Sequence, residues 1–337
     1  MASLVTKPVG RAMGVAVVLV LVALGWFVLQ VDPVFAGKGR DVVVTVHPGD
    51  SLATIAGELH VAGVIASPLA FRVDVLIFGA PLVRPGSYEI RQGASFSAVR
   101  AILGGGPNVV TLTASPGLTL HEMAVTLAGN LGNVYASAFL KDATTIGVHS
   151  PFARNQSLEG LVGAGTYIVR PGESPQKLAQ KMADAFVREA AAAGLTPTTT
   201  LNGLNAYQLV TAASIVEKEG YYPKNMPRVA RVIFNRLRRG GPLQMDATVL
   251  YALGQDGGRV TSAMLQTPSP YNSYLNPGLT PTPICTVSPV ALAAVLHAPP
   301  GPWLYFVVVD RAGDEAFAAT FQQQLANERL AASRGLS

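Results

Sequence analysis

Three patterns of hydrophobic and polar residues follow one another along the chain. The first is a run of twenty residues without a charged side chain, 12–31. As a helix this run would be about 30 Å long, which matches the hydrocarbon core of a bilayer. It therefore predicts a transmembrane helix. A cleaved signal peptide is the alternative, because residues 34–36 resemble a cleavage site, but the apolar part of a signal peptide usually has only about 7 to 15 residues.

Two basic residues, Lys7 and Arg11, precede this run. The positive-inside rule then predicts that residues 1–11 are cytoplasmic and that the rest of the chain is exported. A second stretch without Asp, Glu, Lys or Arg, 275–309, is rich in proline and would not form a helix. We expect a single-pass protein of the inner (cytoplasmic) membrane whose C-terminal part is periplasmic or otherwise extracytoplasmic.

The second pattern alternates short β-branched runs with helical spacing. Residues 41–46 read as a strand, and a turn separates them from apolar positions at helical spacing over 52–59. The same order of a glycine, a hydroxyl side chain and a helix recurs three times. The hydroxyl residues that we expect to cap these helices are Ser95, Thr119 (with Glu122 as its capping-box partner) and Ser174 (followed by Pro175).

Two segments of this region are copies of each other. Residues 86–95 and 165–174 are identical at five of ten positions, which indicates a duplicated strand-helix module. The glycine-rich loop 104–107 is the expected boundary. We predict an N-terminal subdomain over 41–106 and a second domain over 107–337. Repeat architecture alone does not decide between glycan binding and a spacer role.

The third pattern is an acidic helix. Asn205 is a good N-cap, and Gly220 ends the helical spacing that follows it. On a helical wheel Glu217 and Glu219 lie about 200° apart, so they cannot both flank one scissile bond. Glu217 shares its flank with Val210 and Ala213, which would disfavour ionisation and suit a general acid. Two solvated glutamates in the last helical turn are the alternative.

Further elements follow this helix. Asn225-Met226-Pro227 opens a second helix with a buried apolar face and five arginines around it, and Gly240-Gly241 ends it. Residues 244–251 read as a strand-to-helix junction. The apolar run 304–309 predicts a central, buried strand, and residues 316–329 predict a covering helix. Together these elements predict an α+β fold.

Composition narrows the function classes. Charged residues make up 13% of the chain, the net charge is +5 and mean hydropathy is +0.34, which argues against a disordered or nucleic-acid-coating protein. The arginines of the second helix are spread around it rather than clustered, so we expect no nucleic-acid partner. Cys285 is the only cysteine, and the histidines lack a metal-ligand spacing. We expect no metal and no cofactor.

Five motifs then appear in order over about 70 residues. They are Ala213-Ser214-Ile215-Val216-Glu217-Lys218-Glu219, Phe234-Asn235-Arg236-Leu237, Gln244-x-Asp246-x-Thr248-x-x-Tyr251, Tyr271-Asn272-Ser273-Tyr274 and Gly278-Leu279-x-Pro281-x-Pro283-Ile284. In sequence and spacing the chain resembles the MltG family, also called YceG-like, of endolytic murein transglycosylases. That resemblance implies a single membrane anchor, a LysM-like subdomain and a mixed α+β catalytic domain.

The resemblance also implies an activity. It is cleavage of the β-1,4 bond between MurNAc and GlcNAc in nascent peptidoglycan strands, leaving 1,6-anhydro-MurNAc ends without water. One carboxyl group suffices, acting first as acid and then as base, whereas ordinary glycosidases need a pair. By motif position Glu217 is the catalytic residue, with Glu219 as the second candidate. Residues expected to bind the glycan are Glu159, Gln244, Asp246, Thr248, Tyr251, Tyr271, Asn272 and Tyr274.

The expected partners are glycan strands, peptidoglycan synthases and, through the N-terminal helix, the membrane. The sequence departs from the family pattern at two places: Ala164 and Gly165 stand where the family has Pro and Asp, and Glu315-Ala316-Phe317 lacks a family histidine. These losses put substrate contacts there in doubt. A non-catalytic peptidoglycan-binding scaffold and a hydrolysing muramidase remain alternatives.

Overall fold

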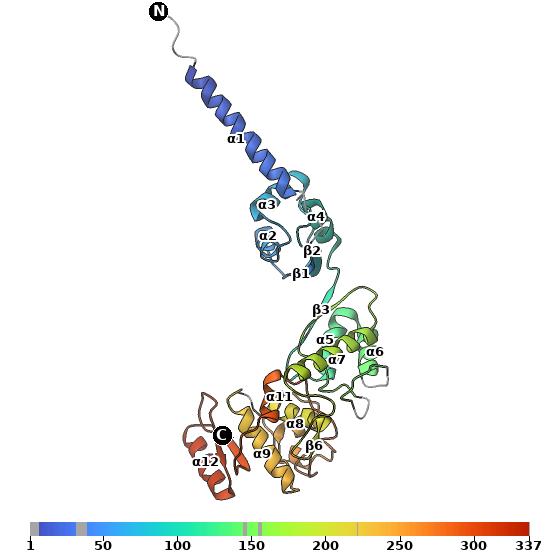
Figure 1. Cartoon of the computed structure of the whole chain (residues 1–337), viewed down its shortest axis with the longest axis vertical. Helices are drawn as coiled ribbons and strands as arrows, with labels where there is room; N and C mark the ends of the chain where they lie inside the picture. Colours follow the sequence, from blue (N-terminus) through green and yellow to red (C-terminus); the bar gives the residue numbers. More distant parts are fainter. Residues whose placement is uncertain (1–6, 32–38, 144–146, 154–156, 221, 337) are drawn as a thin grey trace, which may run out of the picture. The chain divides into compact units, whose positions relative to one another are not determined.

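The computed structural model describes residues 7–31, 39–143, 147–153, 157–220 and 222–336 (Figure 1). It divides into two compact units, one of residues up to Thr111 together with Ile168–Gly172, the other of Leu112–Tyr167 together with the chain from Glu173 onward. Helices predominate, and the strands of the described residues form four two-stranded sheets. The predicted α+β class is confirmed. The expected cytoplasmic segment 1–6 and the alternative cleavage site at 34–36 lie outside the described residues.

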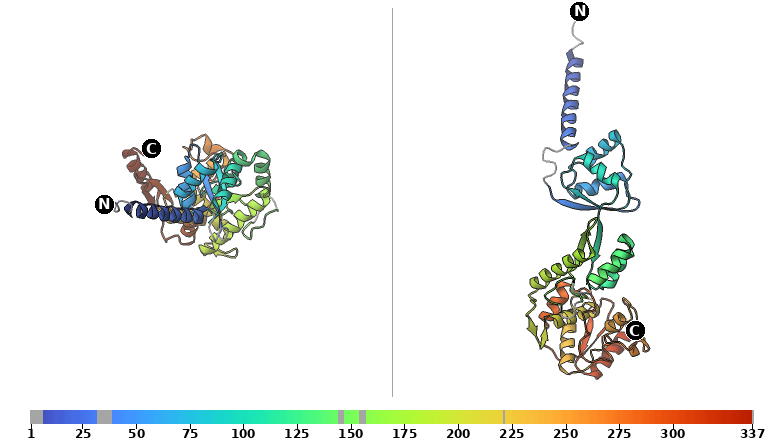
Figure 2. Two further views of the ribbon diagram at one scale, coloured as in Figure 1. Left: turned by 90° about the horizontal axis from the view of Figure 1, so that it is seen from above. Right: turned by 90° about the vertical axis from the view of Figure 1, so that its right-hand side faces the viewer.

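The N-terminal run forms a helix, α1 (Lys7–Val31), which is unbroken in every view (Figures 1 and 2). It begins five residues before the charge-free run, and at its other end Phe27 and Val31 pack against the core of the first unit. Within the described part of the chain, no helix is both long enough and apolar enough to cross a membrane. The prediction of a helix is therefore confirmed, and the prediction that it spans a membrane is not.

The first strand-helix module belongs to the first unit. Its elements are β1 (Asp41–Val46), α2 (Leu52–Val61), α3 (Pro68–Phe78), β2 (Gly86–Arg91) and α4 (Phe96–Gly105). β1 and β2 are antiparallel, with Val44 opposite Tyr88. The side chains of Ser51 and Ser95 cap α2 and α4, and the cap at Ser95 is one that the sequence predicts. Alternate strand residues and the apolar faces of the helices form one core around Phe71, Tyr88 and Phe96.

The second module repeats this order of elements. It consists of β3 (Val110–Ala114), α5 (Leu120–Leu131), α6 (Asn133–Ala143), β4 (Gly165–Val169) and α7 (Pro175–Ala192), with β3 paired to β4. The predicted caps at Thr119 and Ser174 are present. In both copies the second strand holds a tyrosine whose hydroxyl donates to the carbonyl four residues earlier: Tyr88 to Arg84 at 2.5 Å and Tyr167 to Gly163 at 2.7 Å. The predicted duplication is confirmed.

The rest of the second unit is built around one buried helix. Its elements are β5 (Thr200–Leu201), β6 (Leu204–Asn205), α8 (Ala206–Glu219), α9 (Met226–Arg238), α10 (Asp246–Ala252), the 3₁₀ turn η1 (Met264–Gln266), α11 (Pro289–Leu296), β7 (Tyr305–Val308), β8 (Glu315–Ala318) and α12 (Phe321–Ser333). Ten of the fourteen residues of α8 are buried, and α9, α10 and α11 pack around it. Apart from Gln208 near its start, only its C-terminal turn is partly accessible.

Helix α9 also forms where the sequence predicts it. Its apolar face, with Val229, Val232 and Ile233, is buried. Two of its arginines hold the loop that leads to β7: Arg231 donates to the carbonyls of Ala298 and Pro299, and Arg236 donates to that of Leu304. The arginines therefore have structural partners inside this unit.

Predictions near the C-terminus are wrong in part. The run 304–309 forms β7, but in the described chain β7 pairs only with β8, and Val308 is exposed. Its apolar side chains pack across a two-stranded hairpin, where Phe306 and Phe317 stack, rather than inside a larger sheet. Because residues 315–318 pair with β7, the last helix begins only at Phe321. The strand expected before α10 is reduced to an isolated bridge between Pro242 and Pro277.

Candidate functional site

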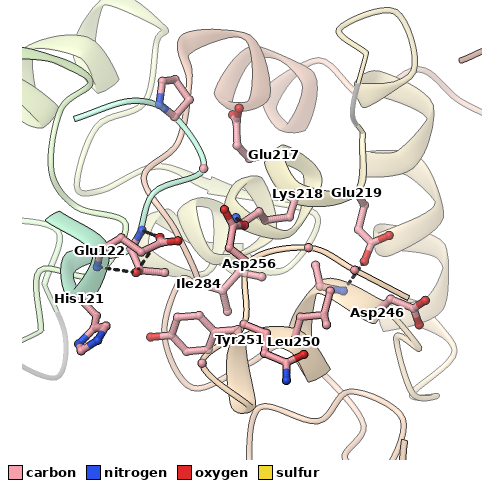
Figure 3. Close-up of a pocket in the computed structure, with 18 of the residues that line it drawn as sticks. His121, Glu122, Glu217, Lys218, Glu219, Asp246, Leu250, Tyr251, Asp256 and Ile284 are labelled. Atoms are coloured by element: carbon pink, nitrogen blue, oxygen red, sulfur yellow. Dashed lines mark hydrogen bonds and ion pairs between the residues drawn. The ribbon is translucent and has the colours of Figure 1, made fainter. Parts of the chain in front are cut away.

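A pocket of about 730 Å³ lies in the second unit, at the C-terminal end of α8 (Figure 3). Six segments that are distant in sequence converge on it: the turn before α5 with the start of that helix, the connection before β4, the end of α8, the start of α9, α10 with the loop after it, and the loop before α11. The residues that line the pocket are Pro116, Gly117, Thr119, His121, Glu122, Glu159, Glu217, Lys218, Glu219, Met226, Asp246, Ala247, Leu250, Tyr251, Gly254, Gln255, Asp256, Gly257, Gly258 and Ile284.

Local sequence explains why α8 ends here. Asn205 and Gln208 form a capping box at its start. At its end Gly220 lies so close to α9 that an added Cβ would come within 2.8 Å of the Met226 side chain. The chain can therefore turn sharply at Gly220 and leave the last helical turn facing the pocket.

Glu217 and Glu219 contact different helices, as the helical wheel predicts. An oxygen of Glu217 accepts the backbone N–H of Ser288, the N-cap of α11, at 2.8 Å. Oε1 of Glu219 accepts the backbone N–H of Ala247, in the first turn of α10, at 2.9 Å. In Figure 3 the two carboxyl groups lie on either side of Lys218. Two glutamates two residues apart on α8 thus bind two different neighbouring helices, yet both line the pocket.

Glu219 lies in surroundings that favour its protonated form. Burial raises the pKa of its carboxyl group to about 7, and the negative charge of Asp246 acts in the same direction. The N–H of Ala247 and the charge of Arg236 lower this pKa, but by less. Among the described residues, only Oε1 has a hydrogen-bond partner. The carboxyl group is therefore fixed through one oxygen, and its second oxygen is available to a ligand.

Glu159 is a second carboxyl group with a raised pKa. It is buried, and burial raises its pKa to about 7. Its two oxygens accept the N–H of Leu120, at the start of α5, and Oε2 accepts the hydroxyl of Tyr251 at 3.4 Å. The next residue, Gly160, has φ of +70°, and a Cβ there would lie 2.2 Å from Pro283. Glycine thus allows the close approach that buries Glu159.

Two other predicted residues line the pocket with support from aromatic neighbours. Asp246 begins α10 and accepts the hydroxyl of Tyr274 at 2.6 Å. The ring of Tyr251 packs against that of Tyr271, with centroids 4.9 Å apart, and the Tyr271 hydroxyl lies 3.0 Å from that of Thr282. Burial and the nearby carboxylates raise the pKa of both Tyr251 and Tyr274 above their usual range. Tyr271 and Tyr274 therefore hold lining residues but do not line the pocket themselves.

The three remaining predicted residues lie outside the lining. Gln244 is exposed and has φ of +52°, and its backbone N–H bonds to Ser273. Thr248 is fully buried, with its hydroxyl bonded to Met245 and Ser273. Asn272 is also fully buried and donates to the carbonyls of Leu265 and Thr267. All three make hydrogen bonds within the chain outside the pocket lining.

The pocket also contains residues that sequence reasoning did not select as a site. Glu122 was recognised only as a capping residue, and its carboxylate does accept from Thr119. Asp256 comes from a glycine-rich loop that carries no recognisable motif; it pairs with Lys218 at 2.5 Å. The capping box that Glu122 forms with Thr119 was the available sequence signal for Glu122. No three His, Cys, Asp or Glu side chains of the described residues are grouped so that they could hold a metal ion.

With this geometry in place, comparison with known proteins identifies the family. A model described as the YceG-like family matches residues 44–330. The chain belongs to the YceG-like family. It is 29% identical over 310 residues to a Bacillus subtilis (strain 168) protein named endolytic murein transglycosylase, and the match covers 87% of this chain and 85% of that protein.

Two further comparisons agree with this membership. A Streptococcus pneumoniae (serotype 2, strain D39) protein of the same name is 28% identical over 311 residues, covering 82% of this YceG-like chain and 55% of the relative, so the chain spans about half the length of that protein. The crystal structure of a yceG-like protein from Listeria monocytogenes has a TM-score of 0.57 at 23% identity and covers 85% of this chain and 98% of that one. The latter supports the fold.

Proposed function

We propose that this YceG-like protein is a peptidoglycan lytic transglycosylase. It cleaves the MurNAc-β-1,4-GlcNAc bond inside nascent glycan strands and leaves 1,6-anhydro-MurNAc ends. The names of the Bacillus and Streptococcus relatives support this activity. The observation that carries the proposal is the pocket at the end of α8 with a half-buried glutamate whose second oxygen is available. Because peptidoglycan is outside the cytoplasmic membrane, this unit acts there.

The proposed reaction needs one proton carrier. The protonated carboxyl group donates its proton to the glycosidic oxygen as the C1–O bond breaks. The resulting carboxylate then takes the proton of the C6 hydroxyl while that oxygen forms the new bond to C1. The group returns to its starting state, and no water enters the product. A carboxyl group with a pKa of about 7 suits both steps at neutral pH.

Glu219 fits this role better than the residue that the motif position favours. The pKa of Glu219 is raised to about 7, and a single backbone bond orients it without occupying both oxygens. Glu217 lines the same pocket and also accepts a single backbone N–H, that of Ser288 in front of α11, so hydrogen bonding does not separate the two glutamates. Glu159 shares the raised pKa, but it is buried and accepts bonds at both oxygens. We assign acid and base to Glu219 because burial raises its pKa, and Glu217, which the motif position favours, is the other candidate.

The proposal extends to the first module. The order of strand, helix, helix and strand over 41–91, with antiparallel β1 and β2, supports a LysM-like subdomain that binds the same glycan strands. Contact with peptidoglycan synthases is part of the proposal, because nascent strands are their products.

Paired substitutions in α8 test the assignment. Glu219→Gln keeps an oxygen that can accept from Ala247 but cannot carry the proton, so kcat should fall by about 10²- to 10⁴-fold. Glu217→Gln keeps the bond to Ser288 and should reduce kcat by less than about tenfold. The measurement is release of anhydro-ended fragments from uncrosslinked glycan strands, followed by mass spectrometry.

Each other outcome identifies a different alternative. A large loss in Glu217→Gln with a small loss in Glu219→Gln would assign the chemistry to Glu217. Products heavier by one water would indicate a hydrolysing muramidase. Tight glycan binding without any cleavage by the wild-type protein would indicate a scaffold, and the proposal would fail.

A further inference from the structure

Charge in the pocket is distributed unevenly. Six of the residues that line it carry carboxyl groups, whereas Lys218 is the only Lys or Arg among them. The carboxyl residues are Glu122, Glu159, Glu217, Glu219, Asp246 and Asp256. An uncharged sugar can enter such a pocket, but an anionic group can be bound favourably only where a cation faces it. Lys218 is therefore the permanently charged cation of the lining and the strongest candidate to bind an anion.

Lys218 is held at a fixed place by the protein. It lies in the last turn of α8, and its side chain is only 22% exposed. Its ammonium group lies beside the turn before α5, 3.9 Å from where a Cβ on Gly117 would be. Figure 3 shows the Lys218 side chain extending to Asp256.

Asp256, the present partner of Lys218, is more exposed than Lys218 and has fewer neighbours to restrain it. Asp256 is 57% exposed and accepts from the Lys218 ammonium at 2.5 Å. It lies in a loop with three glycines of positive φ, at 254, 257 and 258, and a Cβ on any of them would meet no other atom within 4 Å. An ion pair with such an exposed partner contributes little to stability, so another carboxylate can replace Asp256 at small cost.

We propose that Lys218 binds a carboxylate of the peptide that muramic acid carries, and that Asp256 occupies this place until the substrate arrives. This inference rests on the proposed transglycosylase function. Exchange of one carboxylate for another keeps the Lys218 ammonium paired, and the exposed Asp256 can turn to solvent, so an anionic strand can bind despite the surrounding glutamates. The enzyme then selects strands that carry peptides over strands from which the peptides have been removed.

The test uses the full chain and two substrates. One is uncrosslinked glycan strands with their peptides, and the other is the same strands after an amidase has removed the peptides. The quantity measured is the ratio of kcat/KM for the first substrate to that for the second, in which any general loss of activity cancels. We expect a ratio of about ten or more for the wild type, the size of one hydrogen bond to a charged group, and a ratio near one for Lys218→Gln. Lys218→Arg should restore most of it.

Asp256→Asn should change the ratio of kcat/KM in the opposite direction to Lys218→Gln. It removes the competing carboxylate, so the ratio should rise by about two- to fivefold through a lower KM for peptide-bearing strands. Lys224 and Asp314 form a matched control, because they make an exposed Lys–Asp pair that does not line the pocket. Lys224→Gln and Asp314→Asn should each keep the ratio at its wild-type value.

The outcomes separate the two proposals. If the wild type makes no anhydro ends from either substrate, the proposed function fails. If it cleaves both and Lys218→Gln keeps the wild-type ratio, only the role of Lys218 is overturned. Should Lys218→Gln not yield folded protein, an unchanged or lower ratio in Asp256→Asn overturns it instead.

Discussion

The two copies of the strand-helix module differ in what surrounds them rather than in how they are built. Residues 82–88 of the first copy and 161–167 of the second share Leu-Val at the start and Gly-Ser/Thr-Tyr at the end, and the tyrosine makes the same bond in both. Yet Leu82 is 81% exposed, whereas Leu161 is fully buried. The same local sequence thus supports the same turn, and only the neighbouring elements decide whether its apolar side chains join a core.

Loops of the second copy contribute residues to the lining of the pocket. A Pro-Gly turn precedes the first helix in each copy, with φ near +90° at Gly49 and at Gly117, but of the two only the second turn lines the pocket. Two residues before the shared Leu-Val pair, the first copy has Ala80 and the second has Glu159. The two copies thus share their order of strands and helices, and they differ in that the turn, the first turn of α5 and the connection of the second copy line the pocket.

The largest expected effect concerns the glycine that follows Glu159. Gly160→Ala combines a positive φ with a contact of 2.2 Å to Pro283, so we expect a loss of about 4 kcal/mol or more in the free energy of unfolding. Gly172→Ala is the matched control, because φ there is +75° but a Cβ would meet no atom within 4 Å. It should cost about 1–2 kcal/mol. Equal losses in a urea titration would contradict the role of close approach.

The shared leucines test the comparison itself. Leu161→Ala removes a fully buried side chain and should cost about 2–5 kcal/mol. Leu82→Ala removes a mostly exposed one and should change the free energy of unfolding by less than about 0.5 kcal/mol. Both are measured by denaturant unfolding of the full chain. A comparable loss in Leu82→Ala would mean that the first copy buries this residue against a partner.

A smaller effect follows from the raised pKa of Glu159. Because that pKa lies near 7 in the folded protein, above its value in an unfolded chain, the folded state binds the proton more tightly. The resulting stability is fully present below about pH 4.5 and is lost as pH rises through about 7. Glu159→Gln should reduce the fall in stability between pH 5 and pH 8 by up to about 3 kcal/mol.

Its control lies in the first copy. Ala80→Gln places the same amide at the counterpart position and adds no titratable group, so thermal melts should retain the wild-type dependence on pH. If Glu159→Gln also retains the wild-type dependence of stability on pH, the inference that position 159 buries a protonated carboxyl group is wrong.

Local elements could be predicted from the sequence because their signals are local. The caps at Ser95, Thr119 and Ser174 and the limits of α8 depend on residues within one or two helical turns. The duplicated module was visible as repeated letters. The apolar run at 304–309 misled, because an apolar strand is compatible with a large sheet or with a hairpin that packs its aromatic rings on each other.

The candidate site was less accessible to such reasoning. Motifs located the pocket wall at Glu159, Glu217, Asp246 and Tyr251, but whether a motif residue lines a cavity or supports a loop depends on long-range packing. Thr248 and Asn272 belong to the same motifs and hold backbone groups instead. The raised pKa of Glu219 depends on burial by elements distant in sequence and on Ala247 and Asp246, about 30 residues away, and a helical wheel contains no information about them.

The spacing of the acidic motif has a consequence for how the family can vary. The carboxyl groups of Glu217 and Glu219 each accept a backbone N–H at the beginning of a separate helix, that of Ser288 and that of Ala247. Lys218, between them in sequence, also lines the pocket. Inserting or deleting a single residue just before Glu217 would rotate all three side chains by about 100° about the helix axis. Both hydrogen bonds would then be lost together. Length changes in this protein should therefore accumulate in loops such as 254–258, and the last turn of α8 should tolerate none.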